Sequence, residues 1–521
     1  MQEQNSKAPL IIFVAVLASL LEIIDTSIVN VALPTMMGNL GATLEDISMV
    51  ITGYAIANAV ILPVSAWLGE RFGRRRYYLG CIGLFTATSV ACGLAPNLEF
   101  LIIFRILQGL AGGALLPTSQ TLIYEQFPKE KAGLAGAIFG MSVMVGPALG
   151  PVLGGFLTDQ FGWRSIFNIN LPLGLLALFI GATCIFDRPH EHGHVPDKSF
   201  DAVGLILLVL GIGCLQYALE RGESDDWLAS KAIVTCLLLT ITTLPTFVWW
   251  ELKISNPILN IRLLKEQIVV NGILLMALLG FYLYGVLFVL PVFVSYVFHY
   301  TATQTGSLFI PGSLVTMALM PLIGRLMTSG VNPKKLIFIG ITGLMICIYL
   351  LTTISPISSR EEILMTLYVR GFSLAFLFVP INSSILSQFK GVNMGQVSGL
   401  LNLSRQIGGS IGIAVVGTLL SMRAHQNYID LASKVSLLNP NTQQVYYQAE
   451  ANLSKKLNSS IGMVKPTKLA LSTLKRRIDG QVFMMSFNQL MWVIMLIYAF
   501  AYVPWYFLKL RLRTTNIVDS H

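Results

Sequence analysis

The sequence predicts an all-α integral membrane protein, and its composition and hydropathy pattern are the two observations behind that prediction. Of its 521 residues, 54% are hydrophobic and only 12% are charged, whereas soluble domains have about 25% charged residues. Apolar runs long enough to cross a bilayer as a helix recur along the chain. The net charge of +9 is spread over short loops between these runs, which is typical of membrane topology and not of a nucleic-acid-binding surface.

Fourteen segments of about 20 mainly apolar residues qualify as membrane-spanning helices. The first has only Lys7 before it and continues past about 20 residues, so we interpret it as a retained span and not as a signal peptide. We expect the fourteen spans at residues 9–35, 46–68, 77–95, 99–124, 132–157, 165–186, 201–219, 231–251, 267–295, 303–327, 334–354, 362–386, 396–420 and 482–508.

An even number of spans places both chain ends on one side of the membrane. The short loops on that side hold 19 Lys and Arg residues, against 4 in the short loops opposite. Residues 421–481 are left out of this comparison because long loops cross membranes largely regardless of charge. The positive-inside rule therefore predicts a multi-pass membrane protein with both termini in the cytoplasm.

Two internal similarities indicate a duplicated architecture. The basic loop after the second span, residues 69–76, has a counterpart between the tenth and eleventh spans, residues 324–335, and Arg105 in the fourth span has a counterpart in Arg370 of the twelfth. Parallel repeats of this kind are common in transporters. We expect an N-terminal six-helix bundle over 1–186, a linker with two inserted spans over 187–266, and a C-terminal six-helix bundle over 267–521.

Two polar segments interrupt the apolar pattern. Residues 187–200 contain His190, His192 and His194, and without a cysteine or a fourth ligand a solvated linker is favoured over a metal site. The six cysteines lie in apolar runs without metal-ligand spacing and are interpreted as core residues. Residues 421–481 form a polar loop of about 60 residues on the side opposite the termini, and a loop this long is usually functional or disordered. Stretches of it are compatible with amphipathic helix, and we expect it either to dock a partner or to be disordered.

The first span carries two acids, Glu22 and Asp25, in an apolar run. At 100° per residue they share a helix face with Ser19, Thr26 and Asn30. Acids inside a membrane are costly and are functional candidates by default. Burial disfavours the charged form, and an acid held near neutrality can exchange a proton during a transport cycle. The alternative is an acid that is hydrogen-bonded only for helix packing, which remains open above all for Glu22.

Four stretches carry recognisable motifs: DTSIVNVALP in the first span, the loop AWLGERFGRRR, LIIFRILQGLAGG in the fourth span and GPALGPVLGG in the fifth. Together they resemble the major facilitator superfamily, and within it the fourteen-span drug:proton antiporters of the EmrB/QacA type. The sequence departs from the family pattern at Ala66, Glu70 and Ala137. The long outer loop, FDAVGL (200–205) and YTATQTG (300–306) look closer to the EmrB branch.

The resemblance implies a major facilitator fold, with two six-helix halves and two inserted helices, that exports hydrophobic compounds in exchange for protons by alternating access. It implies proton coupling through Asp25 and Arg105, although snorkelling of Arg105 to the outer interface is an alternative. It also implies a location in the bacterial inner membrane, as part of a tripartite pump with a periplasmic membrane-fusion adaptor and an outer-membrane channel. The residues we expect to act in gating are Glu70, Arg71, Gly73, Arg74 and Arg75 in the loop, and Gly146, Gly150, Pro151, Gly154 and Gly155 in the fifth span.

The substrate site is expected near the bilayer midplane between the halves. Aromatic side chains accept varied hydrophobic ligands, and Glu22 would meet cationic groups of a substrate. Arg405 would meet anionic groups, or would only pair structurally. The expected substrate contacts are Glu22, Asn30, Gln108, Tyr282, Tyr284, Phe288 and Arg405.

The sequence thus predicts a proton-driven multidrug efflux antiporter of the kind that confers antibiotic resistance, with no enzymatic chemistry and no cofactor. It contains no GxxxxGK[ST] nucleotide loop, which argues against direct ATP coupling. Two alternatives are a dedicated exporter of one physiological solute, such as a fatty acid or siderophore, and a membrane sensor or scaffold that no longer transports.

Overall fold

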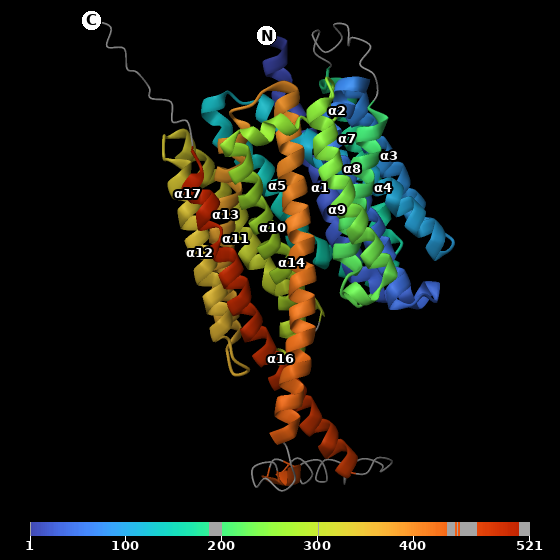
Figure 1. The fold of residues 1–521 in the computed structure, drawn as a ribbon, viewed down its shortest axis with the longest axis vertical. Helices are drawn as coiled ribbons and strands as arrows, with labels where there is room; N and C mark the ends of the chain where they lie inside the picture. Colours follow the sequence, from blue (N-terminus) through green and yellow to red (C-terminus); the bar gives the residue numbers. More distant parts are fainter. Residues whose placement is uncertain are drawn as a thin grey trace, which may run out of the picture.

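The structure, a computed structural model, describes residues 2–186, 201–300, 302–434, 443–444, 446–448 and 466–509. These residues form helices and no strands, so the predicted all-α class is confirmed. Long helices run side by side in one bundle, and α1 begins at the same end at which α17 finishes (Figure 1). We call this end the terminal end and the opposite one the far end.

The helices follow the predicted apolar segments. The first part contains α1 (Gln2–Leu40), α2 (Leu44–Phe72), α3 (Arg74–Gly93), α4 (Leu98–Glu125), α5 (Ala132–Phe161), α6 (Ser165–Asn168) and α7 (Asn170–Cys184). The inserted pair is α8 (Ala202–Arg221) and α9 (Lys231–Lys253). The last part contains α10 (Gln267–Phe298), α11 (Ala302–Thr328), α12 (Pro333–Thr353), α13 (Arg360–Leu386), α14 (Gly391–Lys434), α16 (Pro466–Ala499) and α17 (Tyr502–Phe507).

Local sequence explains where several helices begin. The side chain of Asn97 accepts a hydrogen bond from the backbone N–H of Phe100 at the start of α4, and Ser359 caps α13 in the same way. Such caps satisfy backbone donors that a helix leaves unpaired at its N-terminus. Gly73 separates α2 from α3 with φ +84°, a conformation that a side chain would strain. The backbone conformation at this position therefore explains why the basic loop motif has a glycine there.

The number of membrane crossings is only partly supported. Among the described residues, twelve helices are long and apolar enough to cross a membrane. The third and fifth expected spans correspond to α3 and α5, which pack in the same bundle but are not among these twelve. α3 starts with Arg74, Arg75 and Arg76 and is the less apolar of the two. Fourteen crossings therefore stay a prediction.

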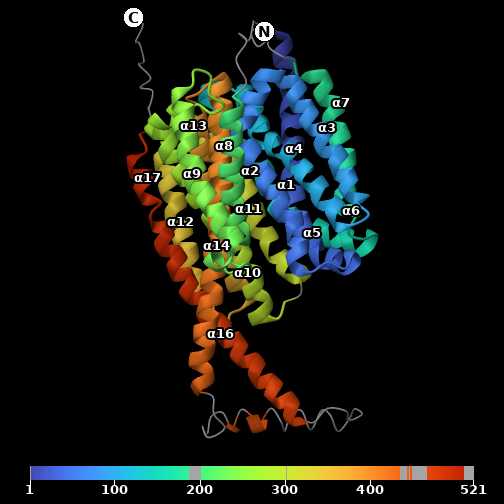
Figure 2. The same cartoon turned by 45° about the vertical axis from the view of Figure 1, so that its right-hand side comes forward.

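The helices pack within two groups and between them. In the first group α1 packs on α5 and α2 on α4, while in the second α10 packs on α14 and α12 on α13. The groups meet where α5 packs on α11 and α2 on α14. The inserted helix α8 contacts both α2 and α14, with α9 against it on the outside of the bundle (Figure 2). The proposed division at residues 186 and 266 remains a prediction.

The prediction of a long loop at 421–481 is wrong for the first and last parts of that segment, which are helical. α14 continues to Lys434 and α16 begins at Pro466, and both project past the far end of the bundle (Figure 1). The 44 residues of α14 span about 66 Å at 1.5 Å per residue, about twice the hydrocarbon thickness of roughly 30 Å. Asn427 of α14 donates to Ser486 Oγ of α16 at 2.9 Å. The rest of that segment, apart from 443–444 and 446–448, lies outside the described residues, as do His190, His192 and His194.

Candidate functional site

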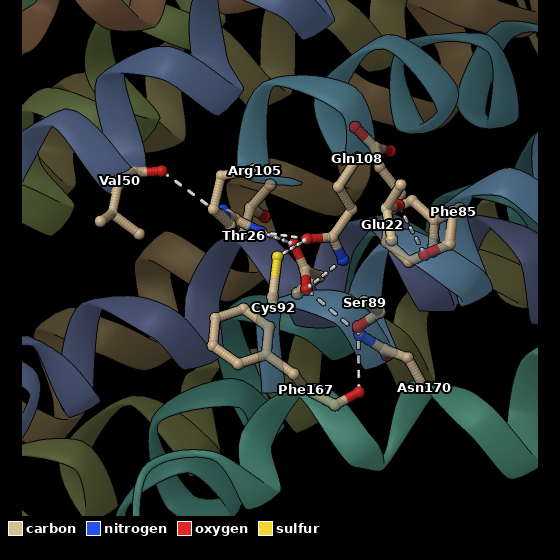
Figure 3. Close-up of polar contacts among 12 residues, drawn as sticks. Glu22, Thr26, Val50, Phe85, Ser89, Cys92, Arg105, Gln108, Phe167 and Asn170 are labelled. Carbon is tan, nitrogen blue, oxygen red and sulfur yellow. Dashed lines mark hydrogen bonds and ion pairs between the residues drawn. The ribbon is translucent and has the colours of Figure 1, made fainter. Parts of the chain in front are cut away.

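Asp25 is the centre of a buried polar network inside the first helix group. Its side chain is fully buried. One carboxylate oxygen, Oδ2, accepts a hydrogen bond from Arg105 Nη1 at 2.5 Å. The other, Oδ1, accepts from Gln108 Nε2 at 2.9 Å and from Asn170 Nδ2 at 3.2 Å (Figure 3). Three donors on α4 and α7 therefore hold one acid on α1.

The buried charge of Arg105 is also stabilised by several contacts besides the ion pair with Asp25. It donates to Gln108 Oε1 at 2.9 Å and to the carbonyl oxygen of Val50 at 3.3 Å. Its guanidinium carbon lies 4.1 Å from the centre of the Tyr54 ring, a distance at which cation–π attraction operates. A buried ion pair is tolerated only with such additional bonds. The structure thus places Arg105 against Asp25 and not at the outer interface.

The sequence explains how α4 and α7 supply these donors. Arg105 and Gln108 are three residues apart and so share one face of α4. Asn170, at the start of α7, also donates to Ser89 Oγ at 3.0 Å, and Ser89 donates to the carbonyl oxygen of Phe167 at 2.9 Å. Sequence analysis found Arg105 and Gln108 but missed Asn170 and Ser89. Asn170 interrupts an apolar run, which is the one signal that pointed to it.

Glu22, one turn before Asp25, has a different environment. It is 4% exposed, and its Oε1 accepts a hydrogen bond from Asn58 Nδ2 at 2.9 Å. Its Oε2 has no hydrogen-bond partner among the described residues. A Cβ on Gly112 would lie 3.4 Å from Glu22 Cγ and 2.7 Å from the Tyr54 hydroxyl, so glycine at this position lets α4 pack on the acid.

Arg405 brings a charge from the second helix group towards Glu22. It is 6% exposed and donates to the Tyr284 hydroxyl at 3.3 Å and to Asn402 Oδ1 at 3.4 Å. Its Nε has no hydrogen-bond partner in the described part of the chain. The next residue, Gln406, donates to the carbonyl oxygen of Ala55 on α2 at 3.0 Å, and Asn58 of α2 is the residue that donates to Glu22. The structure therefore brings together Glu22, Tyr284 and Arg405 of the predicted substrate contacts.

The other predicted substrate contacts lie elsewhere. Gln108 belongs to the Asp25 network. Tyr282 is fully buried, with its hydroxyl 3.3 Å from Cys347 Sγ and its ring packed on Tyr498, so it lies in the core of the second group. Phe288 is 40% exposed. Asn30 is exposed and donates back to its own helix.

The basic loop has two kinds of contact. Arg74 forms an ion pair with Glu125 at 2.6 Å, and Arg75 donates to the carbonyl oxygen of Ala182 at 2.7 Å. Both contacts lie within the first group. Glu70 and Arg71 instead line a cleft with residues 255–262 of the α9–α10 connection and with the start of α14. These two gate candidates therefore face the second group.

The glycines of α5 pack against α1. A Cβ on Gly146, Gly150 or Gly154 would meet Ile23, Ser27 or Ile28, whereas one on Gly155 would have no heavy atom within 4 Å. The first three form a glycine seam inside the first group, and Pro151 lies between them with a side chain outside the described set. We expected these glycines to serve a gate between the halves, but α5 approaches α11 closely at Gly133, opposite Gly324, and at Gly140, against Met320.

A buried polar cluster that sequence analysis missed joins the two groups. Gln120 of α4 donates to Asn382 Oδ1 of α13 at 2.8 Å. Its Oε1 accepts from Ser398 Oγ at 2.5 Å and from Asn402 Nδ2 at 2.9 Å, both on α14. Because α4 finishes at the terminal end, this Gln120 cluster joins the two groups towards that side of the bundle.

Two further buried acids lie on the inserted helices. Asp201 Oδ1 accepts from the N–H of Gly204 at 2.8 Å and from Trp250 Nε1 at 2.9 Å, and Glu251 Oε2 accepts from the N–H of Leu259 at 3.4 Å. The remaining oxygens, Asp201 Oδ2 and Glu251 Oε1, have no hydrogen-bond partner among the described residues. Both would contact a Cβ on Gly204, so they face each other. The described residues hold no group of three or more metal-ligating side chains.

Comparison with known proteins finds relatives that match almost the whole chain. The chain is 33% identical over 481 residues to the multidrug export protein EmrB of Haemophilus influenzae, and the match covers 92% of this chain and 91% of that protein. The Escherichia coli K12 EmrB is 32% identical over 478 residues, covering 92% and 90%. The fatty acid resistance protein FarB of Neisseria gonorrhoeae is 34% identical over 421 residues, covering 81% and 82%. The predicted likeness to the EmrB type is confirmed.

Solved structures support the fold. The human organic anion transporter MFSD10 has a TM-score of 0.57 at 14% identity, covering 78% of this chain and 92% of that one. The proton:xylose symporter XylE has a TM-score of 0.57 at 17% identity, covering 81% and 90%. The Major Facilitator Superfamily model matches residues 15–413. The chain therefore belongs to the major facilitator superfamily, as its four motifs predict, and is a transporter and not an enzyme.

Proposed function

We propose that the protein is a proton-coupled multidrug antiporter that exports hydrophobic compounds across the bacterial inner membrane by alternating access. The observation that carries the proposal is the Asp25 network, in which an acid and an arginine are both fully enclosed. The names of the EmrB relatives, multidrug export proteins, support the substrate range.

The network suggests how a proton changes the bundle. Ionised Asp25 binds α1 to α4 and α7 through three hydrogen bonds. Protonation removes the charge that Arg105 requires and weakens these bonds, so it favours a different packing of α1. A proton and a substrate that prefer different states of one two-state bundle are thereby coupled. The proton gradient is the energy source, and no cofactor takes part.

The orientation and assembly follow from the same proposal. Both termini lie in the cytoplasm, so the Gln120 cluster joins the two groups towards the cytoplasmic side and α14 with α16 projects into the periplasm. That projection is the part of the protein that meets a membrane-fusion adaptor, which leads to an outer-membrane channel. Replacing residues 430–475 with a short linker should abolish co-purification of the adaptor while leaving transport in vesicles intact. Unchanged co-purification would contradict the docking role.

A second candidate is a dedicated exporter of one physiological acid. The relationship to a fatty acid resistance protein favours it. A panel of chemically different compounds separates the two functions: a multidrug exporter transports several classes, whereas a dedicated exporter transports one.

The test of proton coupling uses the purified protein in proteoliposomes. Asp25→Asn should abolish substrate movement driven by an imposed pH gradient but keep substrate exchange without a gradient, because exchange needs no net proton transfer. Glu220→Gln is the matched control, since Glu220 is a half-buried acid on α8 that accepts from Gln216 and Ser410 away from the network. Gradient-driven transport that persists in Asp25→Asn would refute the proposal.

A further inference from the structure

Buried charge is distributed unequally between the two helix groups. In the first group the buried charged residues are Glu22, Asp25 and Arg105. Since Asp25 and Arg105 neutralise each other, Glu22 is left as an acid without a cation in contact. In the second group they are Arg370 and Arg405, and neither forms an ion pair within the described chain. The first group thus holds a buried acid without a paired cation, and the second group holds two buried arginines without a paired acid among the described residues.

Glu22 and Arg405 flank the contact between α2 and α14. Gln406, next to Arg405 on α14, donates to the carbonyl oxygen of Ala55 on α2 at 3.0 Å, and Asn58 of the same helix donates to Glu22 of α1. No hydrogen bond or ion pair between Glu22 and Arg405 is found among the described residues. Each is held by neutral groups only: Asn58 for the acid, and Tyr284 and Asn402 for the arginine. The acid therefore has a well-defined position, and so does the base.

Both residues retain a bonding atom without a partner. Glu22 Oε2 and Arg405 Nε are enclosed and unbonded among the described residues, and the Tyr54 hydroxyl beside Glu22 is unbonded as well. Enclosed polar atoms in native proteins are nearly always hydrogen-bonded. Three such atoms around one interface mark a place where a ligand would supply the missing bonds.

We propose that Glu22 and Arg405 form a two-pole site for amphoteric amphiphiles, that is, compounds with both an ammonium and a carboxylate on one apolar body. This rests on the transport function proposed above and names its preferred substrate class. The ammonium pairs with Glu22 and the carboxylate with Arg405. The half-buried ring of Tyr284, beside Arg405, offers apolar surface for the body between them.

The same geometry disfavours compounds with a single charge. A monocation that pairs with Glu22 also faces the positive charge of Arg405, and a monoanion that pairs with Arg405 faces Glu22. Selectivity arises as much from such repulsion as from attraction. An amphoteric compound is the class that leaves no charge of the site uncompensated.

The test compares three probes with one apolar body: 4′-(aminomethyl)biphenyl-4-carboxylic acid, its methyl ester and its N-acetyl derivative. The first carries both charges at opposite ends, the second carries only the positive charge and the third carries only the negative charge. Binding to the full-length purified protein is measured by isothermal titration without a gradient. The wild type should bind the amphoteric probe at least tenfold tighter than either derivative. Glu22→Gln should remove the preference over the N-acetyl probe, and Arg405→Gln the preference over the methyl ester.

Control variants separate this pattern from loss of structure. Arg370→Gln removes the other buried arginine of the second group, which lies 5.8 Å from the Phe309 ring centre, and should keep the preference. Glu22→Asp keeps the charge and should keep the preference with weaker binding. Equal affinity for all three probes in the wild type, or an equal loss for all three in Glu22→Gln and Arg405→Gln, would overturn the site.

The outcomes also separate this site from the proposed function. Preferential binding of the amphoteric probe without gradient-driven transport of any probe would support the site and refute proton-coupled export. Gradient-driven transport of all three probes with equal affinities would support export and refute the two-pole site.

Discussion

The glycine seam between α1 and α5 allows a sharp test, because one of the motif glycines does not take part in it. A methyl group on Gly150 would lie 2.6 Å from Ser27 Cβ, about 1 Å inside the usual carbon–carbon contact of roughly 3.5–4.0 Å. The Cβ of Ser27 cannot rotate away, so α1 must shift. A methyl group on Gly155 would meet nothing within 4 Å.

The two alanine variants differ in one energy term. Both gain about 1 kcal/mol of helix propensity, but only Gly150→Ala incurs overpacking, which costs about 1–3 kcal/mol. Gly150→Ala should therefore be about 1–3 kcal/mol less stable than Gly155→Ala. It should also transport more slowly, because the shifted α1 carries Asp25.

The assay is unfolding of the purified protein in mixed micelles titrated with sodium dodecyl sulfate and followed by helix content. Gradient-driven transport in proteoliposomes is measured on the same preparations. Equal free energies of unfolding for the two variants would contradict the prediction. They would show that α1 and α5 can move apart at the glycine seam without loss of stability.

Three further predictions concern buried polar groups. Asp25→Asn should destabilise the protein by about 3–5 kcal/mol because Arg105 stays buried without its counter charge, and adding Arg105→Gln should recover part of the loss in a double-mutant cycle. Gln120→Ala should open the terminal end of the bundle, since three hydrogen bonds are lost; faster hydrogen exchange at the start of α14 measures this, and an unchanged rate would contradict it. Glu251→Gln should raise stability by about 1.5–3 kcal/mol, because its amide can donate to Asp201 Oδ2; a destabilised variant would show that the two acids do not oppose each other.

The helices were predictable because an apolar run of about 20 residues is a strong signal. Asp25 and Arg105 were predictable for a similar reason, since a charge inside such a run is rare and conspicuous. Their mutual contact is a matter of tertiary packing, which no spacing along the chain determines. Asn58 and Asn170 were missed because a neutral polar residue in an apolar helix is common, and only packing decides what it meets.

The length of α14 was missed for a different reason. The hydrophobic pattern marks where the bilayer ends, and the helix does not have to end there. Beyond residue 420 the sequence is polar but contains no proline or glycine before residue 434, so nothing in it stops the helix, and contacts such as Asn427 with Ser486 on α16 support it. A polar segment after a span was therefore interpreted as a loop when it is a continuous rod.

That rod links the Gln120 cluster of the transporter to its outermost part. Asn402 is bonded to Gln120 near one end of α14, and the described helix runs on to Lys434. These 32 residues span about 48 Å at 1.5 Å per residue, so each degree of tilt about Asn402 displaces the tip by about 0.8 Å. A protein bound at the tip would be displaced sideways when the Gln120 cluster separates and α14 tilts. In turn, a force applied to the tip by that protein would act on the Gln120 cluster.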